Sequence, residues 1–215
     1  MRKALVVALA VMMCGFYAVA QDYPKAEVFG GFSLAHLDTE NVQSILPAGT
    51  NVKEWYPGWE IAGQYNFTKL LGVKADISGN YGQPVSFPGV TGFPSGRAYT
   101  FLFGPVVSFR GDRITPFVHA GFGGSHLSSD ASTVKGFAVP AISDTAFAMA
   151  FGGGLDWKLT HHFSVRLGQF DYVYTKHDGC AIFAAAEGVA IPAGCESKFP
   201  DHQNNFHFST GIVIH

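Results

Sequence analysis

The sequence predicts an all-β protein, an eight-stranded antiparallel up-and-down transmembrane β-barrel. From Glu27 onward, apolar residues alternate with small or polar residues at every second position, in eight separate runs. Successive side chains of a strand point to opposite faces, so each run predicts a strand with one apolar face. The mean hydropathy is +0.17, yet no apolar run after the N-terminus approaches the ~18–20 residues of a membrane helix. The connections between the runs alternate between short and long.

The eight predicted strands cover residues 25–36, 54–67, 71–81, 98–109, 114–126, 145–159, 163–175 and 204–215. Most of them match the ~9–11 residues that a tilted strand needs to cross a bilayer. The connections at 68–70, 110–113 and 160–162 are short, and those at 37–53, 82–97, 127–144 and 176–203 are long. Short periplasmic turns and long extracellular loops are typical of outer-membrane barrels.

The run 146–157 shows the alternation most clearly. Its odd positions hold large apolar residues such as Phe147, Met149 and Phe151, and its even positions hold Ala, Gly and Asp156. A soluble barrel would enclose the large apolar side chains. Here the small and charged set is left to face inward, which suits a barrel whose outside is lipid.

Sorting each strand by parity gives one apolar, lipid-facing set. In chain order it contains Val28 and Phe32; Trp59, Ile61, Tyr65 and Phe67; Val73, Ala75 and Ile77; Tyr99, Phe101, Phe103, Val107 and Phe109; Val118, Ala120 and Phe122; the odd positions from Phe147 to Trp157; Val165 and Leu167; and Phe206, Phe208, Ile212 and Ile214. Several aromatic residues lie near strand ends, as interface girdles require.

The opposite parity predicts a polar interior. Its predicted network consists of Glu27, Glu60, Lys74, Asp76, His119, Asp156, Arg166 and Asp171, with Gln64, Ser78, His207 and Ser209 on the same face. Asp171 joins this set only if a bulge near Gly168 shifts the parity of its strand. An eight-stranded barrel is only wide enough to be filled by its own side chains. An unpaired buried charge costs several kcal/mol, so we interpret the network as a structural plug around Lys74 and Arg166.

The N-terminal segment predicts a secretory signal peptide over residues 1–20, followed by one barrel domain over 21–215. Arg2 and Lys3 form the positive region, residues 4–13 the apolar core, and 18–20 an A-x-A cleavage motif. The apolar core is too short for a membrane anchor.

Two cysteines remain once Cys14 is removed with the signal. An exported chain with one pair, Cys180 and Cys195, points to a disulfide. Closing a loop of about 15 residues contributes about 3 kcal/mol in the chain-entropy model. The pair is not a CxxC motif and has no His between its members, which favours a disulfide over zinc.

Four segments carry a resemblance to the OmpA-like transmembrane β-barrel superfamily, and more narrowly to its small outer membrane protein beta-barrel domain proteins. They are 28–33 (VFGGFS), 103–109 (FGPVVSF), 115–119 (TPFVH) and 166–172 (RLGQFDY). The resemblance implies a barrel in the bacterial outer membrane, inserted by the barrel-assembly machinery. Nothing follows the eighth strand, so we expect the C-terminal peptidoglycan-binding domain of full-length members to be absent. Members tend to finish on an aromatic residue, where this chain has His215.

Catalytic, cofactor and metal sites are not predicted. Lipid A deacylases of this shape use a His-x-Ser pair with an acid, and His126-Leu127-Ser128 matches only the pair, because no Glu lies between 60 and 187. His161 and His162 are adjacent and therefore poor joint ligands. The Gly clusters at 30–31, 123–124 and 152–154 lie within strands and are not followed by the Lys of a phosphate loop.

The predicted function is a non-enzymatic structural or interaction role at the cell envelope. The alternatives are a narrow pore or hydrophobic-solute transport barrel, and a lipid A-modifying hydrolase. We expect contacts with outer-membrane lipid and lipopolysaccharide, with the assembly machinery, and between the loops and an extracellular ligand. After signal removal, 12 basic residues face 16 acidic ones, so nucleic-acid binding is not expected. The barrel is expected to be a monomer.

Overall fold

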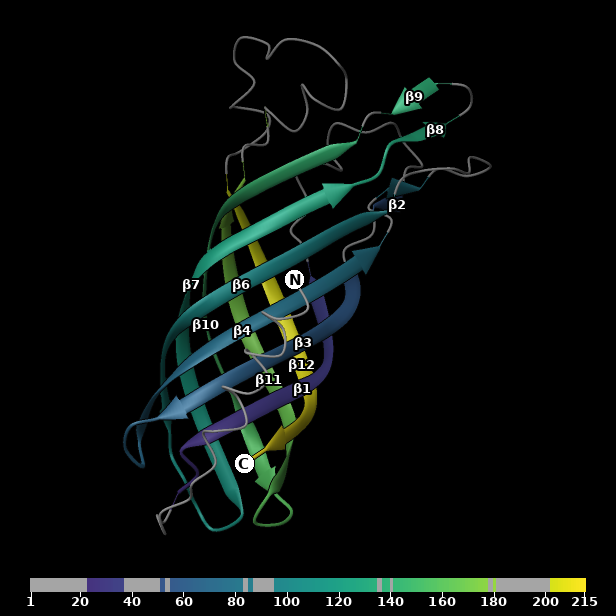
Figure 1. Ribbon diagram of the computed structural model, residues 1–215. Coiled ribbons are helices and arrows are strands. Elements are labelled where there is room, and N and C mark those ends of the chain that lie inside the picture. The colour runs from purple at the N-terminus through teal and green to yellow at the C-terminus, as the bar shows by residue number, and fades with distance from the viewer. Residues whose placement is uncertain are drawn as a thin grey trace, which may run out of the picture.

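Eight long antiparallel strands close into a single barrel (Figure 1). The computed structural model describes residues 23–36, 51–52, 55–82, 85–86, 95–134, 137–139, 141–177, 180 and 202–215. The barrel strands are β1 (Ala26–His36), β3 (Trp55–Asn66), β4 (Leu71–Gly82), β6 (Gly96–Ser108), β7 (Ile114–Ser129), β10 (Ile142–Lys158), β11 (Phe163–Lys176) and β12 (Gln203–Ile214). Each strand pairs with its neighbours in the chain, and β12 closes the barrel against β1.

The predicted antiparallel eight-stranded fold is thereby confirmed. Observed strand boundaries differ from the predicted ones by at most three residues, at the end of β7 (126 predicted, 129 observed) and the start of β10 (145 predicted, 142 observed). Among the described residues, no helix is long and apolar enough to cross a membrane. The predicted signal peptide and Cys195 lie outside the described residues.

Three tight turns gather at one end of the barrel, the lower end in Figure 1. Backbone hydrogen bonds close them, from Phe67 N to Leu71 O (2.9 Å), from Phe109 N to Pro116 O (2.8 Å) and from Leu159 N to Phe163 O (3.0 Å). In two of the turns a threonine hydroxyl accepts backbone N–H groups that the strand ladder leaves free, as Thr68 does from Leu71 N (2.9 Å). We call this end the turn end and the opposite end the loop end.

Two short strand pairs belong to the long connections and were not predicted. β2 (Asn51–Val52) pairs with β5 (Val85–Ser86), and β8 (Ser132–Val134) pairs with β9 (Phe137–Val139). Strands of two or three residues are too short to show an alternating pattern in a sequence.

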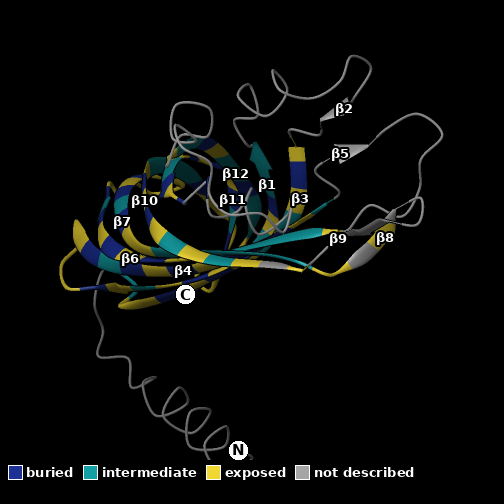
Figure 2. Ribbon diagram, turned by 90° about the horizontal axis from the view of Figure 1, so that it is seen from above, coloured by how far each residue is buried: buried dark blue, intermediate teal, exposed yellow. Residues whose placement is uncertain are grey.

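Burial alternates along the barrel strands, as the view from above shows (Figure 2). The outer face carries large exposed apolar side chains, including Val28, Phe32, Trp59, Ile61, Tyr65, Phe101, Phe103, Val118, Phe122, Phe151, Leu167, Phe206, Ile212 and Ile214. The inner face carries mostly small or polar side chains. Two groups of buried apolar residues lie among them, Phe29 with Ala62 and Val213, and Leu102 with Ala148 and Ala150. A polar lumen inside an apolar wall is the reverse of a soluble barrel.

A bulge interrupts β11, as the parity of Asp171 requires. Leu155 pairs with Gly168 and the next residue, Asp156, pairs with Arg166, so one residue of β11 is passed over on this side. The pairing of β11 with β12 shifts at the same place. The bulge therefore lets Arg166 and Asp171, which have opposite parity, face the same side of the sheet.

Candidate functional site

The lumen holds three clusters of polar side chains. The turn-end cluster contains Glu27, Gln64, Asn66, Ser108 and Arg110. The arginine cluster contains Asp156, Arg166 and Gln169 with the rings of Phe29 and Phe117. The carboxylate cluster contains Glu60, Lys74, Asp76, His119, Asp171 and His207.

Arg166 is the centre of the arginine cluster. Its Nε and Nη2 donate to the two carboxylate oxygens of Asp156 at 2.8 and 3.0 Å, and its Nη1 donates to Gln169 Oε1 at 2.7 Å. The guanidinium carbon Cζ lies over both rings, 4.4 Å from the Phe29 ring centroid and 4.3 Å from that of Phe117. A bidentate ion pair and the faces of two aromatic rings together stabilise a cation that is withdrawn from water.

Lys74 is the cation of the carboxylate cluster. Its Nζ lies 3.4 Å from Glu60 Oε1 and 3.2 Å from Asp76 Oδ2, and it donates to Gln169 Oε1 at 3.1 Å. Lys74 and Glu60 are 3% and 1% exposed, so this pair is shielded from solvent. Its charges therefore depend on protein partners rather than on water.

Gln169 joins the two clusters. Its side-chain oxygen accepts from both Arg166 and Lys74. Its amide nitrogen donates to Asp171 Oδ2 at 2.6 Å and to Glu60 Oε1 at 3.3 Å. The fully buried amide of Gln169 thus accepts hydrogen bonds from two cations and donates hydrogen bonds to two carboxylates.

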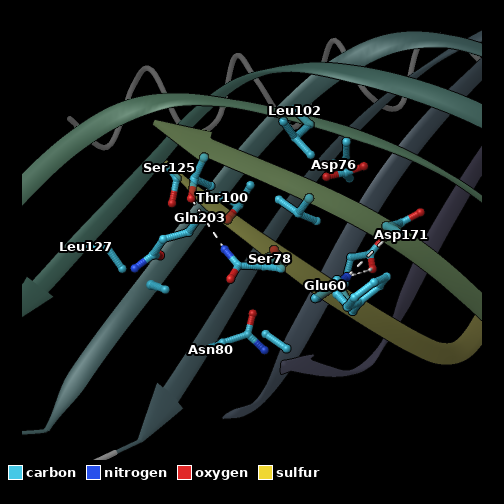
Figure 3. Close-up of a pocket in the computed structure, with 18 of the residues that line it drawn as sticks. Glu60, Asp76, Ser78, Asn80, Thr100, Leu102, Ser125, Leu127, Asp171 and Gln203 are labelled. Atoms are coloured by element: carbon cyan, nitrogen blue, oxygen red, sulfur yellow. Dashed lines mark hydrogen bonds and ion pairs between the residues drawn. The ribbon is translucent and has the colours of Figure 1, made fainter. Parts of the chain in front are cut away.

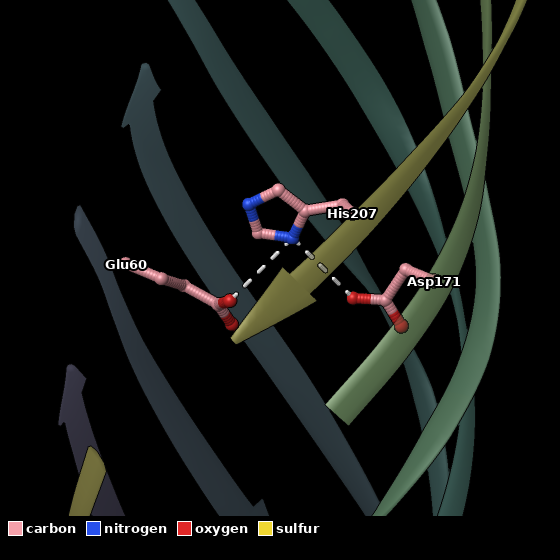
Figure 4. Close-up of side chains that lie close together, drawn as sticks. All are labelled: Glu60, Asp171 and His207. Atoms are coloured by element: carbon pink, nitrogen blue, oxygen red, sulfur yellow. Dashed lines mark ion pairs between the residues drawn. The ribbon is translucent and has the colours of Figure 1, made fainter. Parts of the chain in front are cut away.

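Two histidines complete the carboxylate cluster. His119 Nε2 lies 2.7 Å from Asp171 Oδ1. His207 lies between the carboxylates of Glu60 and Asp171, with Nδ1 3.8 Å from both Glu60 Oε2 and Asp171 Oδ2 (Figure 4). Gly152 of β10 makes room for this arrangement, because a Cβ there would collide with the Asp171 carboxylate and the Phe170 carbonyl.

The turn-end cluster is built around Glu27. Its Oε1 accepts from Asn66 Nδ2 at 2.8 Å and pairs with Arg110, whose side chain folds back from the turn into the barrel. His215, just beyond β12, lies 2.7 Å from the Ser164 hydroxyl through its Nε2. Burial lowers the pKa of His215, so at neutral pH the imidazole is uncharged and Arg110 is the cation that neutralises Glu27.

The structure places all eight residues of the predicted network in the lumen. Asp76, at 9%, is the most exposed of Glu27, Glu60, Lys74, Asp76, His119, Asp156, Arg166 and Asp171. The partners differ from the predicted arrangement for Glu27, which pairs with Arg110 rather than with Lys74 or Arg166. Gln169 was missed although it shares the face of Asp171 beyond the bulge. No sequence signal indicates that the Arg110 side chain folds back from its turn into the lumen.

A cavity of about 60 Å³ adjoins the carboxylate cluster (Figure 3). It extends from Glu60, Asp171 and His207 to Leu127 and Gln203 near the loop end. A second space of about 10 Å³ lies beside Lys74 and Arg166. Because one water needs ~10–15 Å³ of such space, the first cavity has room for a few waters and the second for one at most.

The His126–Ser128 pair lies outside the lumen. Ser125 and Leu127 line the cavity, so the alternating side chains of His126 and Ser128 point to the outer face of β7. The His126 ring is engaged elsewhere, with its Nδ1 2.6 Å from the Thr145 hydroxyl on β10.

Comparisons with known proteins agree with this architecture. The family model of the outer membrane protein beta-barrel domain matches residues 6–208. The crystal structure of Ail, the attachment invasion locus protein of Yersinia pestis, is similar with a TM-score of 0.50 and 14% identity, over 87% of this chain and 97% of Ail. Neisserial surface protein A is similar with a TM-score of 0.52 and 11% identity, over 89% of this chain and 97% of that protein. No curated protein matches the chain. The chain belongs to the outer membrane protein beta-barrel domain family and is a protein of the bacterial outer membrane.

Proposed function

We propose that this protein is a closed, non-enzymatic barrel with a structural or interaction role in the outer membrane. The observation that carries the proposal is the filled lumen. Arg166, Gln169 and Lys74 are each at most 3% exposed and are bonded to one another and to carboxylates on several strands. The interior of an eight-stranded barrel is only wide enough for its own side chains, so these residues leave no open channel beside them.

The filled lumen argues against the pore alternative. A conducted ion or a small sugar needs a continuous water-filled path, whereas the cavity beside the carboxylate cluster measures about 60 Å³. Opening a path would separate Arg166 from Asp156, and an uncompensated buried charge is strongly unfavourable.

The hydrolase alternative needs a serine, a histidine and an acid linked by hydrogen bonds, and the described residues do not offer this arrangement around His126. A serine nucleophile needs a base within ~2.6–3.2 Å of its hydroxyl. The hydrogen-bond partner of His126 is Thr145, and Ser128 faces outward from the strand with no described carboxylate linked to the histidine.

If the lumen is closed, the outer wall and the long loops are the surfaces that contact the surroundings. The exposed apolar belt fits outer-membrane lipid and lipopolysaccharide, and the loops are the surface available to an extracellular ligand. A Cys180–Cys195 disulfide would compact the last loop, and Cys180 is buried. A signal peptide over 1–20, insertion by the barrel-assembly machinery and a monomeric state complete the proposal.

Solute flux into proteoliposomes tests this function. The purified, folded protein is reconstituted into liposomes, and swelling is followed in isotonic solutions of a small neutral sugar. Protein-free liposomes and liposomes with an open porin are the controls. We expect the rate of the protein-free control. Swelling that increases with the amount of folded barrel would favour the transport alternative.

A further inference from the structure

The carboxylate cluster carries more negative charge than its fixed cation can balance. Arg110 neutralises Glu27 and Arg166 neutralises Asp156. The three remaining carboxylates, those of Glu60, Asp76 and Asp171, share a single permanent cation, Lys74. Two negative charges are left in a buried space where unpaired charge is strongly disfavoured.

One carboxylate oxygen is free at the place where this charge gathers. Glu60 is 1% exposed, and its Oε2 has no hydrogen-bond partner among the described residues. This is the oxygen that points at His207, because Lys74 and Gln169 engage the other one. One donor atom each from Glu60, Asp171 and His207 lie within 4.8 Å of one another.

We propose that Glu60, Asp171 and His207 form a binding site for a divalent metal ion of the Zn²⁺ type. One imidazole nitrogen and two carboxylate oxygens are a usual zinc donor set, with bonds of about 2.0–2.2 Å. Such bonds place neighbouring donors roughly 3.3–3.6 Å apart in a tetrahedral site. His207 Nδ1 lies 3.8 Å from each carboxylate oxygen, and the three donor atoms lie within 4.8 Å of one another. Contraction by a few tenths of an ångström closes the two histidine–carboxylate distances, and the two carboxylate oxygens move together by at most about 1.5 Å.

The surroundings supply what else a metal needs. The adjoining cavity provides room for a water as fourth ligand and leads toward the loop end, which gives the ion a path of entry. Ligation through Nδ1 leaves the proton of His207 on Nε2. That atom points away from the two carboxylates (Figure 4) and has no partner among the described residues, so a cavity water can accept its proton. A divalent ion also cancels the two unbalanced charges without protonation of His119 or His207.

The ion would join strands across the closure of the barrel. Glu60 belongs to β3, Asp171 to β11 and His207 to β12, and β3, β1, β12 and β11 are consecutive around the wall. The metal therefore links the two sides of the seam at which the first strand meets the last.

Zinc binding by the untagged, refolded protein tests the site. The metal-stripped barrel is titrated with Zn²⁺ by calorimetry, and bound zinc is counted by elemental analysis after dialysis. We expect about one ion per chain, and a rise of the unfolding midpoint with zinc concentration, because a ligand that binds only the folded state stabilises it. His207→Asn should weaken this binding by more than about tenfold. His126→Asn, which changes an outward-facing histidine, should bind as the wild type does.

Two results would overturn the proposal. One is a wild-type barrel that retains no zinc, in which case protonated histidines balance the carboxylates. The other is equal zinc binding by the wild type and His207→Asn, which would place the ion elsewhere. If His207→Asn loses its strand signal in circular dichroism, Asp171→Asn replaces it, with the same expectation. Either failure leaves the proposed closed barrel untouched, because that proposal does not depend on a metal.

Discussion

Arg166 shows how a single residue holds the lumen together. Its guanidinium reaches Asp156 on β10 and Gln169 on its own strand, and it lies over the rings of Phe29 of β1 and Phe117 of β7. These partners come from four of the eight strands, so the side chain links parts of the wall that do not pair directly. Lys74 has no aromatic ring over it among the residues that the structure describes, and its partners are Glu60, Asp76 and Gln169.

Replacement of Arg166 by Met should therefore destabilise the barrel. The change removes the charge while keeping a long apolar side chain, and it leaves Asp156 buried without its cation. Loss of one partner of a buried ion pair costs about 3–5 kcal/mol. The free energy of unfolding is measured by urea titration in lipid vesicles with tryptophan fluorescence.

Arg97→Met is the matched control. Arg97 pairs with Asp130, but the two side chains are 41% and 65% exposed, and such pairs contribute about 0–1 kcal/mol. Similar losses in the two variants would show that the lumen of the folded protein is solvated rather than dry.

The strands themselves are the part of the fold that the sequence predicts best. A period of two is readable in runs of ten or more residues, and parity then assigns each side chain to lipid or lumen. The bulge was also predictable, because Arg166 and Asp171 cannot share a face without an extra residue between them. Two features could not be predicted, the central position of Gln169 and the folding of the Arg110 side chain into the lumen. Both depend on contacts between residues far apart in the sequence.

Depth in the membrane should govern the effect of charge on the outer face of β10. Phe151 lies six residues from Trp157 at the turn end, which corresponds to ~15 Å of depth for a tilted strand and places it near the bilayer centre. Phe151→Arg should therefore cost about 2–4 kcal/mol, and Phe147→Arg, on the same face but near the loop-end interface, about 0–1 kcal/mol. Both side chains are at least half exposed. Urea unfolding in vesicles measures both costs, and equal values would be inconsistent with the assigned depths.

The whole molecule is an apolar wall around a polar filling, and its two ends are unlike. Three tight turns close one end. At the other, β7 and β10 extend toward the β8–β9 hairpin, and the cavity beside Glu60 extends in this direction as far as Leu127 and Gln203. The proposed interaction with an extracellular ligand therefore belongs to the loop end.

Single-channel recording tests the closed lumen most directly. The folded wild-type protein is inserted into a planar lipid bilayer in concentrated KCl, and the current is recorded at both polarities, with an open porin as the positive control. Because Arg166, Gln169 and Lys74 bridge the lumen, we predict a current that stays at the level of the bare bilayer after insertion. Stable conductance steps of uniform size would contradict the account.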